Sequence, residues 1–106
     1  MKERVYNKLV RDNIPDIIRQ QGETPVIRTL EDGEFLRYLE GKLREEVEEF
    51  LAEKTLNEPG DILEVLEAMA HLQGWTDGEI RHTREEKAQT TGLFRERVFL
   101  EKVIEE

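Results

Sequence analysis

The sequence contains no cysteine and is short of basic residues, with 16 Lys and Arg against 25 Asp and Glu. The absence of cysteine excludes disulfides, Cys-ligated zinc and thiol catalysis. The resulting net charge of −9 disfavours nucleic-acid backbones and anionic membrane surfaces as partners. It leaves room for a phosphate-bearing small molecule, because a bound divalent metal reverses the local sign of the charge.

Long apolar runs are also missing. No stretch approaches the roughly 18–20 residues of a membrane span, and the charged N-terminus lacks the apolar core of a signal peptide. We therefore expect a cytoplasmic protein. A chain of 106 residues is expected to form one domain, residues 1–106.

Apolar residues make up 37% of the chain and charged residues 39%. This balance suits long amphipathic helices whose outer faces carry ion pairs, completed by a second subunit. Disorder is the competing interpretation of such a composition. The regular apolar spacing along the chain argues against disorder and predicts an all-α fold with four helices.

The first helix is expected to be capped by Asp12 or Asn13 and to end at Gly22. The second is expected to open at 31–32 and to run to about Lys54 along a stripe of apolar residues at three- and four-residue steps. Between them, residues 25–30 are rich in β-branched side chains and predict an extended segment, a short strand at most.

The third helix is expected to be capped by Asn57, to stop at Gly74 and to be the most buried of the four. The fourth, opened by Thr76 or Asp77, is strongly polar and is expected to end near Gly92. The apolar tail that follows is expected to dock as a strand or extended arm, with a second extended segment at 97–103.

Two carboxylate pairs flank the turn between the second and third predicted helices. Glu46 and Glu49 precede this turn, and Glu58 and Asp61 follow it. Residues three apart share a helix face, so antiparallel helices would bring the four carboxylates together. Four like charges are unfavourable unless a cation lies among them, and oxygen ligands favour Mg²⁺, Mn²⁺ or Ca²⁺. The alternative is a solvated acidic helix face, because this spacing arises by chance in a chain rich in Glu.

The predicted fourth helix carries Arg81, Arg84 and Lys87 at three-residue steps. One interpretation is a solvated face whose cations pair with the neighbouring Glu85 and Glu86. The other is a phosphate clamp opposite the carboxylates.

Three motifs occur in order along the chain: KLVRDNIPDII at 8–18, EEVEE and EPGD at 45–49 and 58–61, and a K…GLF…RVFL segment at 87–100. In this order they resemble the all-α nucleoside triphosphate pyrophosphohydrolases of the MazG type, which include the phosphoribosyl-ATP pyrophosphohydrolases. The acidic motifs match that family's EExxE, spacer, ExxD pattern. The segment 91–94 departs from the family's usual RGGF by one basic residue and one glycine.

The resemblance implies a four-helix bundle completed by association into a homodimer or homotetramer. It implies Mg²⁺ as the cofactor, with Mn²⁺ as a substitute, and Glu45 or Glu49 as the group that takes the proton of the attacking water. The metal ligands that it implies are Glu46, Glu49, Glu58 and Asp61. The residues that it implies for phosphate binding are Lys87, Arg84 and Arg97, with Lys8 and Arg11 as weaker candidates.

The function that follows from the resemblance is Mg²⁺-dependent hydrolysis of a (d)NTP to the monophosphate and pyrophosphate, in a house-cleaning role. Phosphoribosyl-ATP hydrolysis uses the same chemistry and is the nearest alternative. A non-catalytic acidic helical interaction module is an alternative of a different class. The altered segment 91–94 also keeps open a family member that binds nucleotides without hydrolysing them.

Overall fold

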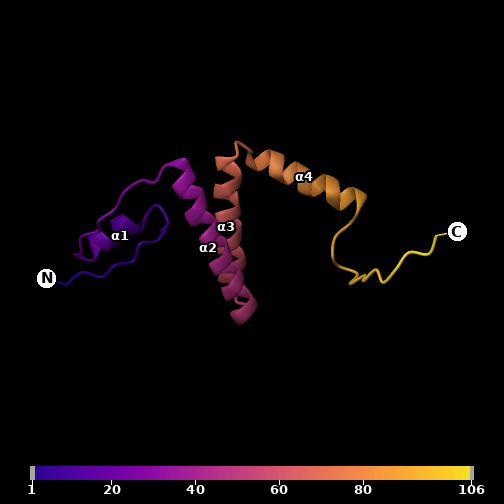
Figure 1. Ribbon diagram of the computed structural model, residues 1–106, viewed down its shortest axis with the longest axis horizontal. Helices are drawn as coiled ribbons and strands as arrows, with labels where there is room; N and C mark the ends of the chain where they lie inside the picture. The colour runs from indigo at the N-terminus through magenta and orange to yellow at the C-terminus, as the bar shows by residue number, and fades with distance from the viewer. Residues whose placement is uncertain (1, 106) are drawn as a thin grey trace. The chain divides into compact units, whose positions relative to one another are not determined.

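The computed structural model describes residues 2–105, which divide after Gly74 into two compact units. Figure 1 shows that the described residues form helices joined by irregular segments, without any strand, so the predicted all-α class is confirmed. The first unit contains α1 (Ile14–Gln20), α2 (Asp32–Glu53) and α3 (Asn57–Leu72), and the second contains α4 (Asp77–Thr90).

The helices α2 and α3 pack side by side as an antiparallel hairpin (Figure 1). The hairpin turns sharply because Lys54, which follows α2, adopts a left-handed backbone conformation with φ of 53°. Its backbone N–H donates to the carbonyl of Phe50 at 2.8 Å and so satisfies one of the last carbonyl groups of α2. This turn places the residues before position 53 of α2 opposite those after position 57 of α3.

Most helix ends lie where the sequence predicts them. Gly22 and Gly74 follow α1 and α3 with φ of 84° and 87°, a left-handed conformation that glycine adopts without steric cost. The start of α3 differs by one position, because Asn57 is its first helical residue rather than its cap and Leu56 precedes it. No side chain caps α3; the Thr55 hydroxyl donates to the carboxylate of Glu58 in the connection before it.

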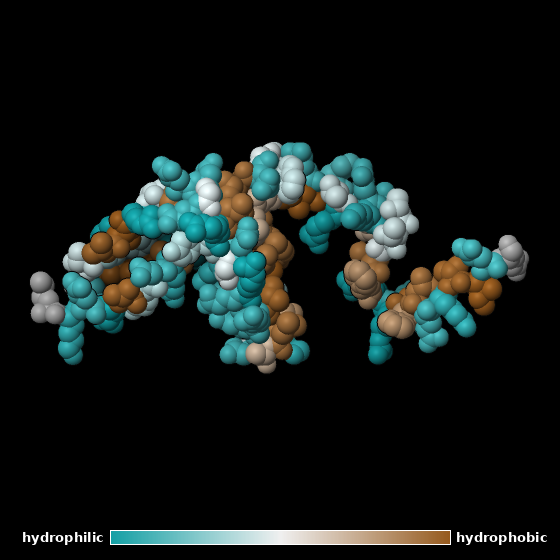
Figure 2. Space-filling model, in the orientation of Figure 1, coloured by the Kyte–Doolittle hydropathy of each residue, from teal (hydrophilic) through white to brown (hydrophobic). Residues whose placement is uncertain are grey.

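The prediction that α3 is the most buried helix is confirmed, because α3 has the largest share of buried and half-buried residues among the four helices. Both α2 and α3 bury one apolar residue, Leu39 and Val65 respectively, and one acidic residue each. On α3, Leu63 is 61% exposed and Leu66 is 43% exposed. The hairpin therefore has a thin core, and Figure 2 shows hydrophobic surface running along it.

In the second unit, α4 opens with a reciprocal pair of hydrogen bonds. The Thr76 hydroxyl accepts from the backbone N–H of Glu79 at 3.1 Å, and the Glu79 carboxylate accepts from the backbone N–H of Thr76 at 3.1 Å. This capping box explains why a strongly polar sequence is helical from Asp77 onward.

The tail after α4, which was expected to dock as a strand or an extended arm, forms no strand. Residues 97–103 have neither helical nor strand structure, and residues 25–30 likewise form no strand. The side chains of Phe94 and Phe99 are 103% and 85% exposed. A strand requires a backbone partner for its N–H and C=O groups, which neither segment has within its own unit. None of the helices within residues 2–105 combines the length and the hydropathy that a membrane span requires.

Candidate metal centre

Glu46 on α2 has an ionisable side chain, yet the residue is buried and only 6% exposed. One carboxylate oxygen, Oε1, lies 3.6 Å from the ammonium of Lys42, one helical turn earlier. The other oxygen, Oε2, is buried and has no hydrogen-bond partner among the described groups. A buried polar atom without a partner costs free energy, so this oxygen points to a ligand that completes its coordination.

Like charges gather around Glu46. Burial raises the pKa of the Glu46 carboxyl, and the negative charges of Glu49 and Asp61 raise it further, with Glu45 adding the least; Lys42 opposes the shift. Asp61 lies on α3, whereas Glu49 is one turn further along α2. The hairpin therefore brings three of the four predicted metal ligands into one electrostatic cluster.

Glu58, the fourth predicted ligand, is also buried to 6% exposure and lies in the first turn of α3. Its carboxylate accepts a hydrogen bond from Thr55 in the connection between the helices. A carboxylate in the first turn also faces the positive end of the helix dipole, which stabilises its charge. Glu58 is therefore stabilised by these interactions. It is not among the charges that raise the pKa of Glu46, which are those of Glu49, Asp61 and Glu45.

Arg11 pairs with Asp61 across fifty positions of sequence. Its Nη2 donates to Asp61 Oδ1 at 2.7 Å, with the two side chains 61% and 41% exposed. Arg11 is one of the residues predicted to bind phosphate, and in this structure it neutralises a predicted metal ligand instead. No local sequence signal indicates this pair, because it depends on how the segment before α1 lies against α3.

The donor set suits a hard divalent cation in its chemistry, but no three of these carboxylates have oxygens within 4.8 Å of one another in this structure. Glu46, Glu49, Glu58 and Asp61 supply only carboxylate oxygens, which suit Mg²⁺ or Mn²⁺. The buried, unpartnered Oε2 of Glu46 is the observation that goes beyond acidic composition. Glu45, predicted to act on the attacking water, is exposed beside Glu46 on α2.

The other residues predicted to bind phosphate lie in exposed positions. The Lys8 ammonium stacks over the ring of Tyr6, 5.7 Å from its centroid. Arg84 on α4 lines a hollow of about 360 Å³ together with Arg81. Lys87, in the last turn of α4, accepts the Thr91 hydroxyl on its backbone carbonyl at 2.8 Å.

Arg97, the last of these residues, lies in the tail of the second unit. It adopts a left-handed conformation with φ of 61°, which is uncommon for a residue with a Cβ atom. It lines a hollow of about 690 Å³ formed by residues 91–98. This hollow includes the segment 91–94, in which the sequence departs from the resembled family.

Part of the chain is similar to an uncharacterised protein of Mycolicibacterium smegmatis (strain ATCC 700084 / mc(2)155). The two are 56% identical over 48 residues, which is 45% of this chain and 49% of that protein. The chain thus spans about half the length of the curated relative it matches. No family model matches the sequence, and no solved structure matches it. Membership of the MazG-type family therefore stays a prediction from the motifs.

Proposed function

We propose that this protein is a Mg²⁺-dependent nucleotide pyrophosphohydrolase of the MazG type, which hydrolyses a (d)NTP to the monophosphate and pyrophosphate. The observation that carries the proposal is the unpartnered Oε2 of Glu46, buried among the negative charges of Glu49 and Asp61. A buried carboxylate among like charges gains most from a divalent cation, whose charge removes the repulsion and whose coordination satisfies the free oxygen.

Glu46, Glu49, Glu58 and Asp61 would hold the ion in this proposal. Mg²⁺ bound there would neutralise charge on the substrate phosphates and acidify the attacking water. Glu49 or Glu45, both exposed on α2, would accept that water's proton. Exposure supports this role because a proton acceptor must exchange its proton with solvent between turnovers.

Substrate binding is assigned to cations, because a triphosphate carries several negative charges. Arg84 and Lys87 on α4, together with Arg97 in the tail, would bind the phosphates that leave as pyrophosphate. These three residues are among the 16 lysines and arginines of the chain. The natural setting of this reaction would be the nucleotide pool of the cytoplasm.

The active form is proposed to be a homodimer or homotetramer. Leu39 and Val65 are the buried apolar residues among those described, whereas Leu51, Leu63 and Leu66 on the hairpin are exposed. Exposed apolar surface of this kind supports association with a second copy. Sedimentation equilibrium tests this part, and a chain that remains monomeric at 100-fold above its assay concentration would contradict it.

The activity is tested by measuring pyrophosphate release from canonical and modified (d)NTPs and from phosphoribosyl-ATP, with Mg²⁺ and with EDTA. We expect release only with Mg²⁺, and loss of release in Asp61→Asn and Glu49→Gln. The matched control is Glu48→Gln, which removes the same charge from an exposed position of α2 and should retain turnover. Turnover that survives Asp61→Asn and Glu49→Gln would contradict the site.

Binding of the metal is measured separately by the melting temperature. Mg²⁺ at ten times its dissociation constant stabilises the folded state by about 1.4 kcal/mol. For a chain of this size, this raises the melting temperature by about 5–10 °C. A metal response without turnover would support a member that binds nucleotides without hydrolysing them. Absence of both would return the carboxylates to a solvated or docking role.

A further inference from the structure

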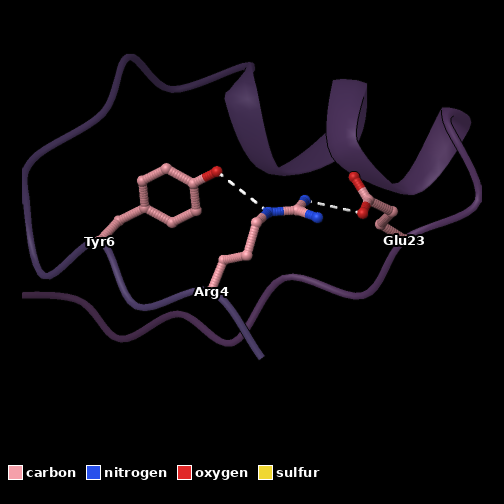
Figure 3. Close-up of polar contacts among 3 residues, drawn as sticks. All are labelled: Arg4, Tyr6 and Glu23. Atoms are coloured by element: carbon pink, nitrogen blue, oxygen red, sulfur yellow. Dashed lines mark hydrogen bonds and ion pairs between the residues drawn. The ribbon is translucent and has the colours of Figure 1, made fainter. Parts of the chain in front are cut away.

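The segment before α1 is attached to the rest of the first unit by two arginines. Figure 3 shows Arg4 between Tyr6 and Glu23, which follows α1. Its Nη2 donates to Glu23 at 2.7 Å and its Nε donates to the Tyr6 hydroxyl at 3.3 Å, and these contacts raise the pKa of the Arg4 guanidinium. The second attachment is Arg11, whose guanidinium reaches Asp61 on α3.

The two attachments differ in what they hold. Arg4 fixes the segment to Glu23, which follows α1 and does not belong to the carboxylate cluster. Arg11 fixes it to a proposed metal ligand, on the oxygen Oδ1 at 2.7 Å. The guanidinium therefore supplies a positive charge to a cluster in which Asp61 and Glu49 repel Glu46.

A guanidinium and a divalent ion that bind the same carboxylate repel each other. Mg²⁺ binds oxygen at about 2.0–2.1 Å and carries twice the charge, so the two cations would repel each other across a few ångströms. Exposed ion pairs such as Arg11–Asp61 are weak, whereas several carboxylates act together on the metal. The metal is expected to win this competition.

We propose that Arg11 is a tethered counter-cation of the metal centre, which neutralises Asp61 in the metal-free protein and is displaced when a divalent metal binds. Displacement detaches the segment at residues 7–13 from α3 and leaves the guanidinium available to a substrate phosphate. The inference rests on the proposed function, because it requires a metal at Asp61.

The direction in which Arg11→Gln changes the metal affinity distinguishes a competing Arg11 from one that positions Asp61 for the metal. If Arg11 competes with the metal, Arg11→Gln binds metal more tightly. If Arg11 instead holds Asp61 in position while Oδ2 ligates the metal, Arg11→Gln binds it more weakly. The probe is Mn²⁺ without nucleotide, with free Mn²⁺ counted by its electron paramagnetic resonance signal. We expect affinity to rise about two- to five-fold in Arg11→Gln, the ratio that corresponds to an exposed ion pair.

The matched control is Arg4→Gln. It removes the same charge from the same segment and breaks the segment's other ion pair, which does not involve the carboxylate cluster. Its Mn²⁺ affinity should equal that of the parent protein. Arg11→Lys retains the charge without the planar fork and should fall between the parent and Arg11→Gln.

Displacement itself is observed with a fluorescent label. The chain has no cysteine, so Val10→Cys, at a 44% exposed position beside Arg11, provides a single attachment point. The label's anisotropy should fall when Mg²⁺ is added to otherwise unchanged protein. With Arg11→Gln in addition, it should be low with and without Mg²⁺. If the anisotropy of the labelled Val10→Cys protein does not change when Mg²⁺ is added, the displacement is overturned.

Failure of this inference is distinguishable from failure of the proposed function. If the parent protein and Arg4→Gln bind no Mn²⁺, the metal centre and the counter-cation role are both refuted. If both proteins bind Mn²⁺ and Arg11→Gln binds it equally or more weakly, the metal centre stands and the counter-cation role is refuted.

Discussion

Lys42 lies one turn before Glu46 on α2, with its ammonium 3.6 Å from Oε1 of the Glu46 carboxylate. The Lys42 side chain is 28% exposed and that of Glu46 is 8% exposed, so a half-buried cation partly neutralises a buried anion. The pair leaves Oε2 of Glu46 without a partner. Lys42 therefore reduces the electrostatic cost of the buried Glu46 carboxylate but leaves its second oxygen without a partner.

Replacing Lys42 by Met should destabilise the metal-free protein at pH 8. The expected cost is about 1 kcal/mol, between that of an exposed pair and that of a fully buried one. Arg44→Met is the control, because Arg44 pairs with the more exposed Glu40 at 3.9 Å and should cost less than about 0.5 kcal/mol. Urea unfolding in EDTA measures both. Equal costs would show that Lys42 does not compensate the buried charge.

The raised pKa of Glu46 predicts a pH dependence of metal-free stability. Because the folded state favours the protonated carboxyl, Glu46 contributes stability below its unfolded pKa, about 4.3. This contribution is lost as the pH rises through the folded pKa. Glu34 acts in the opposite direction, since its hydrogen bond with Arg28 lowers the pKa of its carboxyl and its contribution is lost as the pH falls.

The Glu46→Gln variant separates these two effects. In EDTA, its stability relative to the parent protein should increase from pH 4 to pH 8, because the parent alone pays for ionising Glu46 over that range. Glu48→Gln, at an exposed position of the same helix, should show a flat difference. Thermal unfolding at pH intervals of 0.5 provides the measurement. A flat difference for Glu46→Gln would contradict the burial of an ionised Glu46.

The thin core predicts a large difference between two leucines of α2. Leu39 is 4% exposed and Leu51 is 61% exposed. Leu39→Ala should cost about 2–4 kcal/mol through lost burial and an unfilled cavity. Leu51→Ala should cost under about 1 kcal/mol in a monomer. Denaturant titration of both variants at low protein concentration checks this, and a large cost at Leu51 would indicate that an assembly covers it.

The capping box predicts that α4 depends on Thr76. Thr76→Ala removes one of the two reciprocal hydrogen bonds and should destabilise the helix by about 1 kcal/mol. Thr83→Ala removes a hydroxyl that bonds the carbonyl of Glu79 within the helix and should be neutral or slightly stabilising. Amide hydrogen exchange reads the effect on α4 directly. Equal protection in the two variants would argue against the cap.

Local sequence determined the helices of this protein. Gly22, Gly74 and Thr76 lie at helix boundaries for reasons confined to a few neighbouring residues: a left-handed conformation after a helix, or a hydroxyl that accepts a backbone N–H before one. Apolar residues at three- and four-residue steps likewise identified α2. Asn57 was misplaced by one position: it is the first helical residue, and the residue at the cap, Leu56, has no side-chain cap hydrogen bond that the sequence could have indicated.

Sequence spacing also selected Glu46, Glu49, Glu58 and Asp61, because positions three apart share a helix face. It could not distinguish their individual states. Only the packing of α2 on α3 buries Glu46 and leaves one of its oxygens without a partner, while Glu49 stays exposed. Burial depends on what lies across the hairpin, which no spacing within one helix reports.

The sequence by itself thus determined the helices and the carboxylate motif, because both depend on interactions within a few residues. Tertiary structure decided that Glu46 and Glu58 are the buried carboxylates and that Arg11 neutralises Asp61. Arg11 reaches Asp61 across fifty positions. Such a contact exists only once the chain has folded, because it depends on the path of the segment before α1 and not on any periodicity of the sequence.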